Sequence, residues 1–153
     1  MSERGDRAVA CFGGGFNCTQ AVLSTFAPEL GLNDQTALRV AGAFGAGVAR
    51  RGEMCGAVSG ALMVIGLKTS STTPGDDESK EACYNLAGEF VRRFAARNGS
   101  SVCRELLGCN LSTPEGYAHA VEKGLFHRIC PGLVRESADI LDEILVDKDC
   151  HRV

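Results

Sequence analysis

The sequence predicts an all-α fold, a single-domain bundle of six to eight helices that spans residues 1–153. Helix N-cap residues recur along the chain, and apolar residues spaced three and four apart follow them, which is the period of a half-buried helix. No stretch alternates apolar and polar residues as a half-buried β-strand does. A chain of 153 residues with a hydrophobic fraction of 44% can bury a sizeable core within one domain.

The first two predicted helices are separated by three consecutive glycines. The first covers residues 3–12 and ends at glycines 13–15. The second begins after Asn17, whose side chain is a good N-cap, and Gln20 three residues later completes a capping box. We expect this helix to stop near the proline and glycine of residues 28–31.

The helix that opens at Cys55 and continues into the apolar run 62–67 has a face of small residues. Gly56 and Gly60 stand four residues apart, so both lie on one side of the helix. Each glycine costs about 1 kcal/mol relative to alanine inside a helix. The pair therefore indicates a surface that something approaches closely. A neighbouring helix is the favoured interpretation, and a cofactor or thiol cluster pressed against Cys55 is the alternative.

The remaining helices are located by their terminal residues. Capping residues and prolines place helix starts at Asn33 or Asp34, near Glu78, at Ser100 or Ser101, at Thr113-Pro114 and at Cys130-Pro131. The helix of residues 78–97 carries an apolar stripe and ends at Asn98-Gly99. The preceding stretch 69–77 is rich in Ser, Thr, Pro and Gly, which predicts a surface loop.

Composition argues against several classes of function. The net charge of -3 and the absence of tryptophan give no basis for nucleic-acid binding. The longest apolar run is too short to span a bilayer, and the charged N-terminus lacks the apolar segment of a secretory signal. We therefore expect a cytoplasmic protein without a nucleic-acid or membrane partner. The small-residue face of Gly56 and Gly60 and the apolar stripe of the last helix further predict a homodimer.

Eight cysteines are the main anomaly of the composition. They are Cys11, Cys18, Cys55, Cys83, Cys103, Cys109, Cys130 and Cys150. Structural disulfides explain so many thiols poorly outside a secreted setting. No C-x-x-C pair is present, so zinc-ribbon and thioredoxin signatures are missing, and without C-x-x-C-H there is no c-type haem motif.

Four of these cysteines lie at predicted helix N-termini: Cys18, Cys55, Cys103 and Cys130. A helix N-terminus offers unpaired N–H groups and the positive end of the helix dipole. Both features lower the pKa of a thiol and stabilise the thiolate. Four such thiolates can ligate a metal ion, hold an iron–sulfur cluster or form reversible disulfides. Unrelated buried thiols are the simpler alternative.

The other four cysteines have no comparable position. Cys11 and Cys83 lie on helix stripes that face a core, and we interpret them as core thiols. Cys109 follows a helix end and Cys150 lies in the C-terminal tail. The sequence leaves the roles of these four cysteines open, and a second redox pair among them is one of the alternatives.

Two features close to the cysteines in sequence are weaker candidates. His127 stands three residues before Cys130, where it can act as an alternative ligand or proton donor, although most such histidines are surface residues. Arg50 and Arg51 precede Cys55 closely enough to offset the charge of a thiolate or cluster. A solvated basic turn explains the two arginines equally well.

Four motifs occur in order along the chain. They are Gly15-Phe16-Asn17-Cys18, Cys55-Gly56-Ala57-x-x-Gly60, Cys103-Arg104-Glu105-Leu106-Leu107-Gly108, and a late Cys130. Together they resemble the C-GCAxxG-C-C family of redox-active proteins, over about residues 8–146. The resemblance implies a helical protein with a redox role and four family cysteines, here Cys18, Cys55, Cys103 and Cys130.

The resemblance also suggests a cofactor. Related domains occur joined to cytochrome c segments, where the four thiols suit a two-iron, two-sulfur cluster. This chain lacks the haem motifs, so electron transfer between haem and cluster within one chain does not carry over.

Three functions remain open from the sequence. The leading one is a redox protein whose four family cysteines bind an iron–sulfur cluster or another metal and exchange electrons with a partner that the sequence does not identify. The second is a thiol–disulfide oxidoreductase that uses reversible cysteine pairs. The third is a structural metal-binding or interaction module. Whether the chain is an enzyme stays open.

Overall fold

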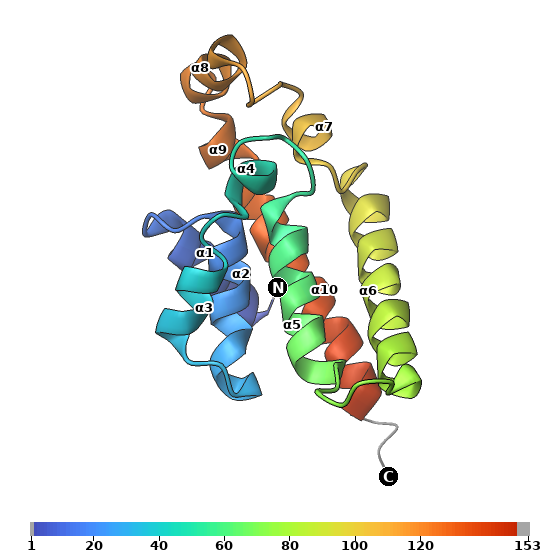
Figure 1. Cartoon of the computed structure of the whole chain (residues 1–153). Coiled ribbons are helices and arrows are strands. Elements are labelled where there is room, and N and C mark those ends of the chain that lie inside the picture. The colour runs from blue at the N-terminus through green and yellow to red at the C-terminus, as the bar shows by residue number, and fades with distance from the viewer. Residues whose placement is uncertain (1, 150–153) are drawn as a thin grey trace.

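Residues 2–149 are described by a computed structural model, in which the chain is all-α (Figure 1). Eight helices have five residues or more, as the sequence predicted, and α4, α9 and the 3-10 turn η1 are shorter. The elements are α1 Glu3–Gly13, α2 Cys18–Phe26, η1 Ala27–Leu30, α3 Asp34–Val40, α4 Gly45–Val48, α5 Gly56–Thr69, α6 Asp77–Asn98, α7 Cys103–Leu107, α8 Pro114–Glu122, α9 Leu125–Arg128 and α10 Cys130–Asp149. Cys150 lies outside the described residues, so its role is untested.

The bundle is built around the C-terminal helix α10, which packs against α1, α2, α5 and α6 (Figure 1). α2 packs along α5 on one side, and α6 packs along α5 and α10 on the other. The short helices α4, α7, α8 and α9 gather at one end of the bundle, and α5 and α10 both begin at this end (Figure 1). Residues that start these helices are therefore brought to a common region of the molecule.

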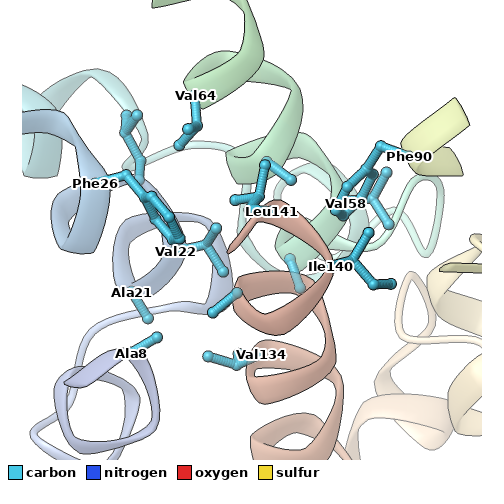
Figure 2. Packing of buried hydrophobic residues seen from close by; sticks show 14 of the residues in the cluster. Ala8, Ala21, Val22, Phe26, Val58, Val64, Phe90, Val134, Ile140 and Leu141 are labelled. Carbon is cyan, nitrogen blue, oxygen red and sulfur yellow. The ribbon is translucent and has the colours of Figure 1, made fainter. Parts of the chain in front are cut away.

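The main core fills the space between α2, α5, α6 and α10. Figure 2 shows side chains from these helices meeting there, among them Val22, Val58, Phe90 and Leu141. The ring of Phe90 lies over that of Phe94 one turn later, with 6.0 Å between the ring centroids. This stacked pair comes from the predicted apolar stripe of α6 and anchors that helix to the bundle.

The small-residue face of α5 is explained by helix packing. A Cβ atom on Gly60 would lie 2.9 Å from the carbonyl oxygen of Thr19 and 3.1 Å from Cβ of Val22, both in α2. Only glycine permits this approach, so the favoured interpretation of Gly60 is correct. The apolar stripe of α10 is likewise covered by its neighbouring helices. Both surfaces that motivated the homodimer are thus buried within the chain, and self-association stays a prediction.

The predicted helix caps are largely confirmed. Three N-cap side chains accept backbone hydrogen bonds: Asn17 from Gln20, Asn33 from Thr36, and Thr113 from Gly116. The capping box is complete, because the Gln20 side chain accepts the N–H of Asn17 at 2.9 Å in return. The serine cap of α7 was wrong: Val102 is the N-cap, without a capping side chain, and Ser100 Oγ accepts the N–H of Val102 at 2.9 Å.

None of the helices between residues 2 and 149 has the length and apolar character needed to cross a membrane.

Candidate cysteine site

Backbone pairing holds the starts of α5 and α7 together. The N–H of Cys55 donates to the carbonyl oxygen of Ser101 at 2.8 Å, and the N–H of Cys103 donates to that of Glu53 at 2.6 Å. An antiparallel bridge between Met54 and Val102 lies between these bonds. Two cysteines that are 48 residues apart in sequence are thereby fixed side by side.

Cys18, the first residue of α2, lies against the first turn of α5. A Cβ atom on Gly56 would lie 2.6 Å from Sγ of Cys18 and 2.6 Å from Oγ1 of Thr19. The glycine that follows Cys55 therefore leaves room for the Cys18 sulfur. Gly56 serves both helix packing and the cysteine site, which joins the two interpretations that the sequence left open.

Cys130 begins α10 directly after the short helix α9. It belongs with Cys103 to a small buried cluster, separate from the main core. The other buried members of this cluster are Leu107, Leu111 and Ala120. Cys18 and Cys55, in contrast, are members of the main core.

All four predicted cysteines line one cavity of about 530 Å³ at this end of the bundle. Their exposed fractions are small: 4% for Cys55, 7% for Cys103, 8% for Cys130 and 9% for Cys18. Each one is the N-cap or first residue of its helix, as predicted. The sequence assigned the same four positions to one site, and the fold brings them together.

Burial raises the pKa of all four thiols. The pKa is raised to about 12 for Cys103 and for Cys130. Backbone N–H groups at the helix starts act in the opposite direction on Cys18 and Cys55, as the sequence predicted. The predicted net lowering was nevertheless wrong, because the loss of hydration outweighs the hydrogen bonds.

A left-handed backbone turn, Ala46–Arg50, forms part of the cavity wall. Five consecutive residues have φ between 50° and 68°, and only Gly47 among them is a glycine. A Cβ atom on Gly47 would lie 2.7 Å from Cβ of Cys103, so the turn passes close to that cysteine. Left-handed conformation costs about 1–2 kcal/mol for each residue with a side chain. Nothing in the local sequence marks alanine, valine or arginine for this conformation.

The two arginines before Cys55 differ in position. Arg50 lines the cavity, and its guanidinium carbon lies 4.3 Å from the ring centroid of Tyr117. Arg51 points to solvent and pairs with Glu53 at 3.2 Å. Of the two arginines expected to offset thiolate or cluster charge, Arg50 lines the cavity, and Arg51 matches the alternative of a solvated turn.

Aromatic residues complete the cavity wall, and sequence reasoning missed them. They are Phe12, Phe16, Tyr117 and Phe126. Phe16 stands beside Cys18 in the first of the four motifs, but the other three come from separate elements and carry no local signal. His127, the proposed alternative ligand, is exposed and is not among the residues that line the cavity.

The other described cysteines do not line the cavity. Cys11 and Cys83 are half-buried against the main core, with Ser24 Oγ at 3.6 Å from Cys11 Sγ and Ser70 Oγ at 3.5 Å from Cys83 Sγ. Cys109 is half-buried against the small cluster that contains Cys103. Among residues 2–149, no three Cys, His, Asp or Glu side chains lie close enough together to hold a single metal ion.

Thiol alkylation is expected to separate the two groups of cysteines. In reduced, metal-free protein at pH 8, iodoacetamide should label Cys11, Cys83 and Cys109 at least about tenfold faster than the four cavity cysteines. The thiolate is the reacting form, and each unit by which the pKa rises lowers the thiolate fraction about tenfold. Labelling of Cys103 and Cys130 should accelerate as the pH rises toward their pKa of about 12.

Mass spectrometry of peptides from timed samples measures each labelling rate. Faster labelling of the cavity cysteines than of Cys83 would contradict the burial that the structure gives them.

A family model described as "Putative redox-active protein (C_GCAxxG_C_C)" matches residues 16–144. All four cavity cysteines fall within the matched range. No curated protein and no solved structure gives a significant match.

Proposed function

This chain belongs to the C_GCAxxG_C_C family, and on that premise we propose that Cys18, Cys55, Cys103 and Cys130 bind an iron–sulfur cluster of the two-iron, two-sulfur type. The protein would act in electron transfer. One observation carries the proposal: four cysteines from four helix starts line a single, largely apolar cavity.

The number of thiols and the volume of the cavity support this proposal. A two-iron cluster takes four thiolates, two on each iron. A cavity of about 530 Å³ is much larger than one ion needs and admits a multi-atom group. Apart from the thiols, its wall is mainly apolar and offers no carboxylate among the described residues. The cysteines are therefore the natural ligands of a soft metal there.

The backbone around the sulfurs suits a negatively charged group. Backbone N–H groups of Ala46, Thr19 and Gly56 lower the pKa of Cys18, and those of Ala57 and Val58 lower the pKa of Cys55, against the larger effect of burial. Hydrogen bonds of this kind stabilise thiolate ligands and tune the potential of the group that they hold. The cluster, when bound, would supply the ability to accept and release one electron. The chain would exclude water from it by the near-complete burial of the cysteines.

The raised thiol pKa values count against the alternative of a thiol–disulfide oxidoreductase. An attacking cysteine in that class has a lowered pKa and is a thiolate near neutral pH. Burial here works in the opposite direction for all four thiols. A metal can still displace the protons, since ligation itself favours the thiolate.

The test is the metal content of protein purified without oxygen. We expect about two iron and two acid-labile sulfide per chain, with visible absorbance that bleaches on reduction. Colourless protein with one zinc per chain would instead support the structural metal module. Colourless, metal-free protein with reversible loss of free thiols would support the oxidoreductase. Either result would overturn the cluster proposal.

A further inference from the structure

We propose that the open side of the cysteine cavity binds a small organic anion with a flat apolar body, and that Arg50 and Tyr117 recognise its negative group. The inference rests on the proposed function in one respect: it would place this molecule beside the redox group held by the cysteines. Arg50, Tyr117 and the aromatic residues that form this anion site are separate from the four cysteines.

The cavity has the volume and the apolar lining of a small-molecule site. Its volume of about 530 Å³ lies within the range of about 300–1,000 Å³ that small-molecule pockets occupy. Rings of Tyr117 and Phe126 stand 6.0 Å apart at 44°, and both line it. Phe16 also lines it and is 42% exposed, while the cysteines are nearly buried. The cavity thus combines nearly buried thiols with aromatic rings, one of them exposed to solvent, on which a flat molecule can stack.

Arg50 gives the cavity wall a positive charge. Within the part of the chain that the structure describes, no carboxylate pairs with Arg50, whereas the adjacent Arg51 pairs with Glu53. Arg50 Nη2 donates to the hydroxyl of Tyr117 at 3.3 Å. A guanidinium has five N–H donors, so most remain available for a bidentate contact with a carboxylate or sulfonate. Among the described residues, the cavity wall therefore carries a cation that no carboxylate neutralises.

Arg50 has a strained, left-handed backbone conformation. Arg50 has φ 68° and is the last residue of the left-handed turn Ala46–Arg50. Its ring contact with Tyr117 ties this turn to α8, and both residues line the cavity. Strained non-glycine residues of this kind cluster at ligand sites, where the surrounding structure keeps them in position.

The experiment compares two probes of the same shape on the protein as purified. They are 2-naphthoate, an anion, and 2-naphthalenemethanol, which is neutral, and calorimetry measures the binding of each. We expect naphthoate to bind at least about tenfold more tightly, the usual scale of a hydrogen-bonded charge contact. Arg50→Gln should remove this preference, so that the two probes bind with similar affinity. Arg51→Gln is the matched control and should keep the preference.

Three results would overturn the site: no binding of naphthoate, equal binding of both probes, or the same loss in Arg51→Gln as in Arg50→Gln. Iron and sulfide are measured on the same preparations. A preference for naphthoate in protein without iron would uphold the anion site and reject the cluster. If wild type and Arg50→Gln both hold a full cluster and neither prefers the anion, the cluster is upheld and the anion site is rejected.

Discussion

Replacing Cys55 by serine is expected to abolish bound iron, acid-labile sulfide and visible absorbance in anaerobically purified protein. A serine oxygen replaces a thiolate poorly as a ligand of soft metals. Cys55 is 4% exposed, and burial together with the nearby Cys18 and Cys103 raises its pKa. The substitution therefore removes the most buried of the four thiolate ligands. Serine at Cys18, Cys103 or Cys130 should have the same effect.

Cys83→Ser is the matched control for this prediction. Cys83 is half-buried against the main core and outside the cavity, with Ser70 Oγ as a hydrogen-bond partner at 3.5 Å. The variant should keep its iron and lose about 1 kcal/mol of stability, measured by thermal unfolding. Cys11→Ser should behave in the same way. A Cys55→Ser protein with full iron beside a Cys83→Ser protein without it would show that the cavity is not the site.

Gly56→Ala is expected to remove most of the bound iron without touching a cysteine. Alanine is intrinsically better than glycine in a helix by about 1 kcal/mol. Here the added methyl group would stand 2.6 Å from Cys18 Sγ and from Thr19 Oγ1, both short side chains in a packed interface. Relief of this overlap must displace the Cys18 sulfur or move α2 away from α5, at a cost of about 1–3 kcal/mol. Iron content and the melting temperature should therefore fall together.

Gly66→Ala, in the same helix, separates this effect from helix propensity. A Cβ atom at Gly66 would meet Ser70 Oγ at 3.8 Å, an ordinary contact. This variant should keep its iron and gain up to about 1 kcal/mol of stability. If Gly56→Ala also kept its iron and melted higher, the close approach of Gly56 and Cys18 would play no part in the site.

The elements of the fold were predictable where local chemistry decides them. The capping box of Asn17 and Gln20 and the proline start at Thr113 depend on residues within one turn, so the sequence placed both helices correctly. The cap of α7 failed because backbone pairing with residues 52–55 fixes the start of that helix, and this pairing crosses about 50 residues of sequence.

The cysteine site was predictable in its members but not in its environment. Each of the four cysteines marks a helix start, and that much is local. The direction of the thiol pKa values depends on hydration, which only the assembled bundle removes, so the prediction from helix ends alone had the wrong sign. The left-handed turn at Ala46 and the ring of Tyr117 carried no signal, because tertiary contacts hold both of them in place.

The division of the cysteines between two buried clusters has a consequence for iron supply. Cys18 and Cys55 are fixed by the main core, which apolar packing alone can sustain. Cys103 and Cys130 belong to a cluster of five buried residues, two of which are these cysteines. So small an apolar cluster contributes little free energy of its own, and a bound group that bridges both pairs would act as a cross-link for this end of the molecule. When iron is scarce, the segment between residues 104 and 129 would loosen and become accessible to the cell's proteases. The lifetime of the protein would then depend on the availability of the metal.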